Sequence, residues 1–155
     1  DHSEHILLEK HRKTGKKIVN EISKKNNLIC CTEQVDPNEY LVKLKKSKIC
    51  VAPYGLGERI ALDQYGLLAG CIVIKPPMDF IDCDPNIYDN NFFEFCKLDF
   101  SDIENIITNI INNYKNKYLE LAIERRKNLI KYDEGYFSTQ FYNNIKDVMD
   151  NNKLI

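Results

Sequence analysis

Two glycines and a carboxylate lie close together near the middle of the chain, in the segment PYGLGE at positions 53–58. Gly55 and Gly57 have no side chain, so their backbone amides can come close to a bound molecule. A helical pattern starts at Glu58, and a helix start offers unpaired N–H groups and a partial positive charge. This arrangement suits a small anion such as a diphosphate. A glycine turn before a helix is also common where nothing binds, so the loop by itself leaves both interpretations open.

The segments around this loop alternate between strand and helix patterns. A surface helix is predicted from Ile6 to about Lys25, and a short buried strand from Leu28 to Thr32. Asp36-Pro-Asn-Glu39 combines an N-cap, a first-turn proline and a capping-box glutamate, which predicts a helix that ends near Lys46. The other predicted elements are strands at 48–52, 71–75 and 92–98, a helix at 58–69, a helix at 101–110 that opens with a second capping box, and helices at 115–131 and 138–149.

Strands that alternate with helices over short connections predict one α/β domain, with a Rossmann-like parallel sheet and flanking helices. Ligands of such sheets bind at the carboxyl ends of the strands. The loop from Pro53 to Gly57 follows the predicted strand at 48–52 and so lies at such an end. The glycine loop is therefore where this fold would place a ligand.

Composition narrows the classes of partner. The chain has 155 residues, enough for one domain with a substantial core, and its 43% hydrophobic content excludes a disordered chain. A formal net charge of -1 argues against a nucleic-acid partner. No apolar run approaches the roughly 20 residues that a membrane span needs. Most of the six cysteines lie in apolar runs and none forms a CxxC pair, which favours a reducing, cytoplasmic compartment.

The wider region around the loop has a recognisable order of motifs. SKICVAPYGLGE is followed by a helix that ends in AGC, an apolar strand, KPPM at 75–78, and then PNIY and CKLDFSDIENII. This order resembles the C-terminal, nucleotide-sugar-binding half of GT-B glycosyltransferases, in a branch related to the exostosin-like and group 1 enzymes. The resemblance runs from Tyr40 to about Ile111. The matching positions are Ser47, Lys48, Pro53, Gly55, Gly57, Glu58, Ala69, Gly70, Lys75, Pro76 and Met78.

The resemblance implies a donor site within a single domain at 1–155, which would be a fragment of a longer protein. The glycine loop would hold the diphosphate of a nucleotide sugar, and Glu58 would accept hydrogen bonds from the sugar hydroxyls. Lys75 would either lie near the phosphates or be a solvated strand end. The donor-binding residues expected on this basis are Tyr54, Gly55, Gly57, Glu58, Arg59, Tyr65 and Lys75.

Two positions depart from the family pattern. Similar sequences carry a basic residue four positions after the glutamate and a second glutamate seven positions after it, whereas this chain has Leu62 and Tyr65 there. These offsets fall on one face of a helix, which is therefore apolar apart from a phenol. Arg59 and Asp63 are placed to form an i,i+4 pair on a neighbouring face. The departures keep a second function open, that of a non-catalytic GT-B-like binding or scaffolding domain.

The resemblance also implies what the chain lacks. The acceptor pocket and the catalytic base of inverting members come from an N-terminal GT-B half, so the isolated chain is expected not to transfer sugar at a useful rate. No cofactor or metal is expected, because a helix start and basic side chains neutralise the diphosphate in such sites. The acidic triplet Asp82-Cys-Asp84 and the group His2, Glu4, His5 and His11 are disfavoured as metal sites, since DxD occurs often by chance and chain ends fray.

Overall fold

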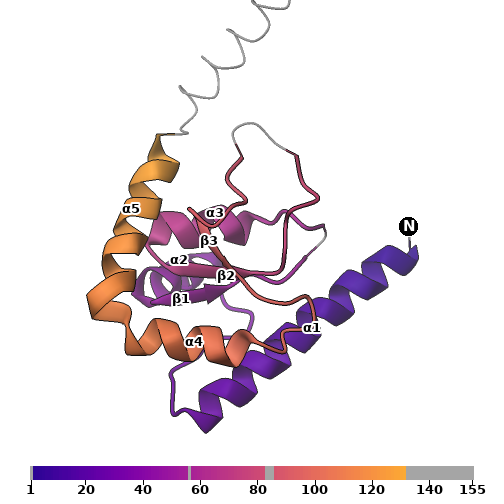
Figure 1. Cartoon of the computed structure of the whole chain (residues 1–155). Helices are drawn as coiled ribbons and strands as arrows, with labels where there is room; N and C mark the ends of the chain where they lie inside the picture. Colours follow the sequence, from indigo (N-terminus) through magenta and orange to yellow (C-terminus); the bar gives the residue numbers. More distant parts are fainter. Residues whose placement is uncertain (1, 56, 83–85, 132–155) are drawn as a thin grey trace, which may run out of the picture.

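A parallel sheet of three strands, in the order β1-β2-β3, lies at the centre of the structure (Figure 1). The computed structural model describes residues 2–55, 57–82 and 86–131. The strands are β1 (Ile49–Val51), β2 (Ile72–Lys75) and β3 (Phe93–Phe95), each within its predicted range. Cys50 pairs with Val73, and Val73 with Phe93. The predicted mixed α/β class is confirmed, and the small sheet with flanking helices is compatible with a Rossmann-like fold.

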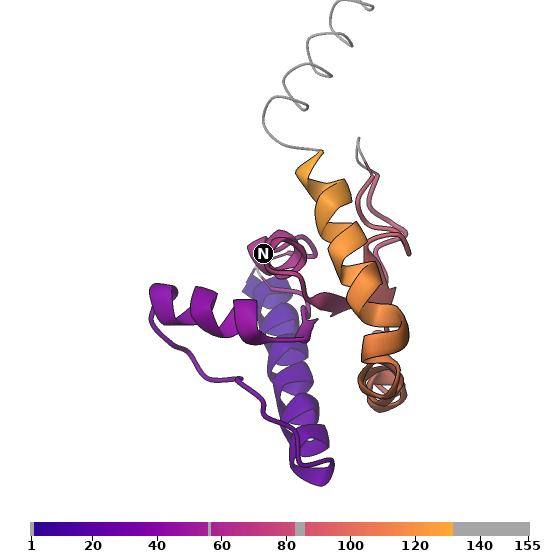
Figure 2. The same ribbon diagram turned by 90° about the vertical axis from the view of Figure 1, so that its left-hand side faces the viewer.

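Helices surround this sheet. They are α1 (His2–Lys25), α2 (Pro37–Lys46), α3 (Ala61–Ala69), α4 (Ile103–Asn112), the π-helical turn η1 (Tyr114–Tyr118) and α5 (Leu119–Ile130). The helix α3 contacts both α2 and α5, and Figure 2 shows it between them. In Figure 1, α1 extends beyond the sheet at its N-terminal end. None of the helices in the described ranges is long and apolar enough to cross a membrane.

The sheet separates two apolar clusters, because successive strand residues point to opposite faces. On one face, Cys50, Val73 and Phe93 pack with side chains of α2 and α3. On the other face, Ile72 and Ile74 pack with α4 and with part of α1. The helix α5 contributes side chains to both clusters. It runs along the amino ends of the strands, and the glycine loop lies at their carboxyl ends.

The predicted strand from Leu28 to Thr32 is wrong. Asn27 adopts a left-handed conformation (φ 51°) after α1, and the Thr32 hydroxyl donates to the Asn20 side chain at 2.8 Å. These contacts hold the segment beside α1, and the side chain of Ile29 is fully exposed. A short apolar run carries no information on where its backbone hydrogen bonds go, so it cannot by itself distinguish a strand from an extended connection.

Two helix starts differ from the prediction. The helix α3 begins at Ala61, three residues after the predicted start at Glu58. The second capping box is also absent: α4 begins after Asp102, whose carboxylate accepts from the Lys97 amide at 2.8 Å, while Glu104 pairs with Lys25 at 2.7 Å. The predicted helix at 115–131 corresponds to η1 and α5, and the one at 138–149 lies outside the described residues.

Candidate functional site

The glycine loop connects β1 to α3 at the carboxyl end of the sheet, where the sequence placed it. Gly55 is buried, and its amide donates to the Gly57 carbonyl at 2.9 Å. A Cβ atom on Gly55 would lie 2.7 Å from Cγ2 of Ile60, so a larger residue there would force Ile60 or the loop to shift. A Cβ atom on Gly57 would meet nothing within 4 Å. No contact within the described chain therefore explains the second glycine.

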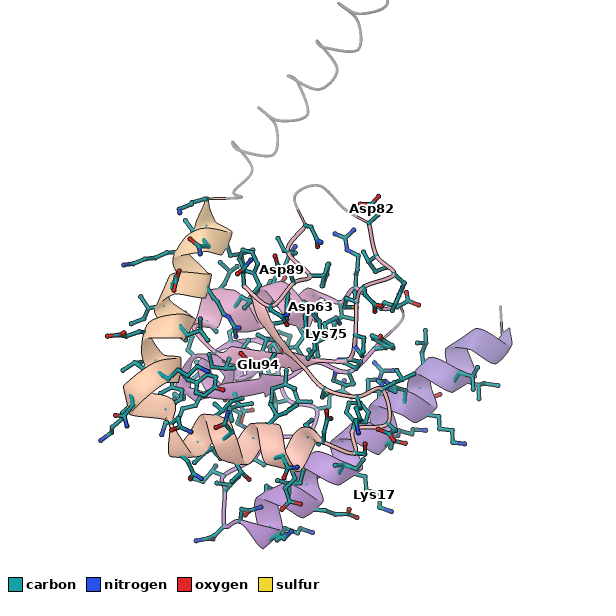
Figure 3. All side chains as sticks on the ribbon, in the orientation of Figure 1. Lys17, Asp63, Lys75, Asp82, Asp89 and Glu94 are labelled. Carbon is teal, nitrogen blue, oxygen red and sulfur yellow. The ribbon has the colours of Figure 1, made fainter. Side chains whose placement is uncertain are left out.

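Lys75 ends the central strand directly beneath this loop. Its side chain is 0% exposed; its ammonium lies 3.0 Å from Oδ1 of Asp63 and donates to the Glu58 carbonyl at 2.6 Å. Figure 3 shows Lys75 and Asp63 side by side. The ammonium also faces the rings of Tyr54 and Tyr88, at 5.5 and 6.0 Å from their centroids. The predicted solvated strand end is therefore wrong, while direct contact with a phosphate stays a prediction.

Asp63 forms a capping hydrogen bond at the start of α3 and also pairs with Lys75. Its Oδ2 atom accepts hydrogen bonds from the Ile60 amide at 3.1 Å and from the Tyr88 hydroxyl at 3.2 Å. The expected pair between Arg59 and Asp63 is wrong, because Arg59 precedes the helix and i,i+4 spacing does not apply to it. The Arg59 guanidinium instead lies over the Tyr88 ring, 5.7 Å from its centroid.

Burial shifts the pKa values of the side chains in this cluster. Burial raises the pKa of Asp63 and lowers the pKa of Lys75, and the opposite charge of each partner offsets part of the shift. Burial, followed by the charges of Glu58 and Asp79, raises the pKa of Tyr54 to about 12. Burial also raises the pKa of Tyr88. Both phenols are therefore neutral hydrogen-bond donors near pH 7: Tyr54 donates to the Pro77 carbonyl and Tyr88 to Asp63.

A histidine of α1 packs against the loop. The His11 ring stacks on Tyr54 with 5.0 Å between centroids and lies 4.6 Å from the Phe100 ring. Its Nε2 atom is 3.0 Å from the Leu98 carbonyl, which can only accept, so Nε2 carries the proton. His11 thus serves packing here. Among the described residues no group of three or more His, Cys, Asp or Glu side chains could hold a metal ion, and Cys83 and Asp84 lie outside them.

Several backbone amides of the loop have no hydrogen-bond partner among the residues that the structure describes. The amide of Ile60 is used by Asp63, and that of Asp63 donates to the Ile60 carbonyl at 3.0 Å. None of the hydrogen bonds between described residues uses the amides of Glu58, Arg59, Ala61 or Leu62. The side chain of Glu58 is half-buried and that of Arg59 is exposed. The loop therefore presents N–H groups beside one cation and one carboxylate.

The structure brings together most of the predicted donor-binding residues but not all. Tyr54, Gly55, Gly57, Glu58, Arg59 and Lys75 gather around the loop. Tyr65 lies on the outer side of α3, 49% exposed, near Tyr40 of α2. Sequence reasoning did not assign Asp63, Tyr88 or His11 to this site. Asp63 could have been found as an acidic side chain in the first turn of a helix that starts at Ala61, but no local signal marks Tyr88.

Comparison of the chain with protein-family models, with curated proteins and with solved structures gave no match. The class that the structure establishes is a mixed α/β domain with a small parallel sheet. Three strands are too few to establish one half of a GT-B fold.

Proposed function

We propose that this chain is the nucleotide-sugar-binding domain of a GT-B-like glycosyltransferase and that it holds the donor across the glycine loop. The observation that carries the proposal is a set of N–H groups, at Glu58, Arg59 and the start of α3, that no other described residue accepts from. They lie next to Gly57, a glycine that packing against the described residues does not require. Their position at the carboxyl end of a parallel sheet, where such folds bind ligands, supports it.

Each exposed group then has a distinct role. The diphosphate oxygens accept from the free amides and from the Arg59 guanidinium, whose planar donors match phosphate oxygens in pairs. The Glu58 carboxylate accepts from hydroxyls of the transferred sugar, since an ionised carboxylate offers only acceptors. No divalent metal takes part, so EDTA leaves binding unchanged; loss of binding in EDTA, copied by Asp84→Asn, would favour a metal-dependent site instead.

Transfer itself requires a second half. We propose that an N-terminal GT-B half supplies the acceptor pocket and the catalytic base, in a cytoplasmic protein. A missing base alone lowers a rate by on the order of 10²–10⁴. The isolated chain is therefore expected to bind donor without turning it over. Turnover at ordinary enzyme rates, measured as product by mass spectrometry, would contradict this division.

A second candidate is a non-catalytic binding or scaffolding domain. Two observations favour it. The outer side of α3 carries Tyr65 and Leu68, both exposed, where a donor-binding helix would carry charged side chains. The Asp63 carboxylate already lies at the start of α3, which reduces the positive charge that this helix offers to an anion. A domain that binds no nucleotide would keep the fold and use such an apolar surface for a protein partner.

A thermal-shift panel of uridine and guanosine diphosphate sugars separates the two candidates. A ligand at 100 times its Kd stabilises the native state by about 2.7 kcal/mol, a rise in Tm on the order of 5–10 °C for a domain of this size. We expect such a rise for the wild type and its loss in Gly57→Val. Lys24→Ala, on the exposed face of α1, is the matched control and keeps the rise. A flat panel, or an equal rise in Gly57→Val, contradicts the proposal.

A further inference from the structure

We infer that Lys75 is a positioning residue of the proposed donor site, on whose existence this role rests: it orients the Glu58–Arg59 peptide group and does not touch the ligand. The direct contact is the hydrogen bond of 2.6 Å from the Lys75 ammonium to the Glu58 carbonyl. That bond comes from inside the protein, because the Lys75 side chain is 0% exposed.

Peptide geometry converts this buried contact into an outward donor. A trans peptide group is planar, and its C=O and N–H bonds point in opposite directions. Because the Glu58 carbonyl points at the buried ammonium, the Arg59 N–H points away from it. The Arg59 side chain is exposed, and no hydrogen bond between described residues uses its amide. The Arg59 N–H therefore faces the side from which a ligand approaches.

Asp63 anchors the next peptide group. Its Oδ2 atom accepts from the Ile60 amide at 3.1 Å, while its Oδ1 atom lies 3.0 Å from the Lys75 ammonium. The two peptide groups that flank Arg59 are thus held by the two members of one buried ion pair. Tyr88 adds a further restraint through its hydroxyl bond to Asp63 at 3.2 Å. The backbone of Arg59 is fixed before any ligand arrives, which lowers the entropic cost of binding.

The ion pair itself contributes little net attraction to an anion. Lys75 and Asp63 carry opposite charges and are both 0% exposed, so their fields largely cancel at the loop. Attraction comes instead from the Arg59 guanidinium and the oriented amides. This distinguishes a positioning role for Lys75 from a role as a phosphate ligand, in which its charge would act directly.

The test compares three proteins by isothermal titration with uridine diphosphate and with inorganic pyrophosphate: the wild type, Lys75→Met/Asp63→Leu and Arg125→Met. The double variant replaces the pair by apolar side chains of similar size, a change that buried pairs often tolerate. Arg125→Met also removes a buried cation that binds backbone carbonyls, but at the amino ends of the strands. We expect the double variant to bind about tenfold or more weakly and Arg125→Met to bind as the wild type does.

Amide hydrogen exchange gives a second readout in the ligand-free proteins. Exchange or chemical shift of the Arg59 amide is expected to change in the double variant and not in Arg125→Met. Asp63→Asn serves if the double variant does not fold, because it keeps an acceptor for Ile60 and leaves Lys75 in place. Its affinity is expected to stay within about threefold of the wild type. A gain of more than about tenfold would show that the uncovered charge of Lys75 acts directly on the ligand, which overturns the positioning role.

The outcomes separate the two proposals. Binding by the wild type with unchanged affinity in a folded double variant overturns the positioning role and leaves the donor site standing. Absence of binding by the wild type to either probe overturns the donor site itself, and the positioning role with it. Equal weakening in the double variant and in Arg125→Met assigns both effects to general destabilisation, which also overturns the positioning role.

Discussion

Two buried cations hold loops at opposite ends of the sheet, and the loops differ in what they leave free. Arg125 of α5, 2% exposed, donates to the carbonyls of Asn90 and Asn91 at 2.9 and 3.1 Å, just before β3. Lys75 donates to the Glu58 carbonyl just after β1. Each cation also pairs with a carboxylate: Asp63 for Lys75 and Glu94 for Arg125.

The amides of the two loops differ more than their anchors do. Asp89 accepts from the amides of Asn91, Phe92 and Phe93, so the loop that Arg125 holds uses these three donors internally. The loop that Lys75 holds leaves the amides of Glu58 and Arg59 without a partner among the described residues. At the amino ends of the strands, the buried cation thus holds a loop whose amides are largely used within the fold. At the other end, the loop leaves amide donors that the proposed ligand would use.

The largest effect is expected for Lys75→Met. The substitution leaves the Asp63 carboxylate 0% exposed and without its cation, which costs about 3–5 kcal/mol in unfolding free energy. Adding Asp63→Leu is expected to recover most of this loss, since no buried charge then remains. Urea unfolding of the single and double variants measures both values. A double variant no more stable than Lys75→Met would show that the pair acts through more than its charges.

Arg125→Met is expected to cost less, about 2 kcal/mol, through the carbonyls that lose their donor. The smaller cost follows because its partner Glu94 is 28% exposed and can be hydrated once the guanidinium is gone. The same urea experiment measures it. A larger loss of unfolding free energy in Arg125→Met than in Lys75→Met would contradict this prediction.

Alanine at the two glycines tests which part of the loop is structural. Gly55→Ala is expected to cost about 1–3 kcal/mol, because its Cβ atom would lie 2.7 Å from Ile60. Gly57→Ala is expected to change stability by no more than about 0.5 kcal/mol, since nothing lies within 4 Å of its Cβ position. Thermal unfolding reports both. Equal costs at the two positions would mean that Gly57 has a structural role too.

The smallest effect expected is a pH dependence of stability that comes from His11, which packs against the glycine loop at the carboxyl end of the sheet. Burial lowers the pKa of His11 below 6.5, so the folded state binds fewer protons than the unfolded state just below that pH. Stability is therefore expected to fall as the pH drops from 6.5 towards the lowered pKa, and to level off below it. His11→Phe keeps an aromatic ring and is expected to lose this slope. Identical slopes in urea midpoints between pH 5 and 7 would exclude His11 as the source.

The architecture was largely predictable because it depends on local patterns. Three strands, the helix after Asp36 and the position of the glycine loop all follow from apolar periodicity, proline and glycine. The segment from Leu28 to Thr32 failed because an apolar run does not specify a pairing partner. The predicted start of α3 at Glu58 was wrong. The helix begins at Ala61, and Asp63, its third residue, accepts a hydrogen bond from the amide of the preceding residue, Ile60.

The interior of the site could not be predicted, because it depends on contacts between distant segments. A lysine at a strand end is ordinarily solvated, and only the fold places Asp63 and the Glu58 carbonyl around Lys75. Tyr88 reaches Asp63 from a connection that has no regular pattern. His11 meets Tyr54 through the packing of α1, which periodicity predicts as a helix but not as a neighbour of the loop.

A donor site at the glycine loop is tested most directly by titrating the isotope-labelled chain with uridine and guanosine diphosphate sugars and following its backbone amide signals. We expect that one of these ligands shifts the amide signals of Gly57, Glu58 and Arg59 most, together with those of Ala61 and Leu62 at the start of α3. Signals of the loop at Asn90 and Asn91 are expected to stay in place. Shifts confined to the lysine-rich face of α1, or no shifts with any ligand, would contradict a donor site at the glycine loop.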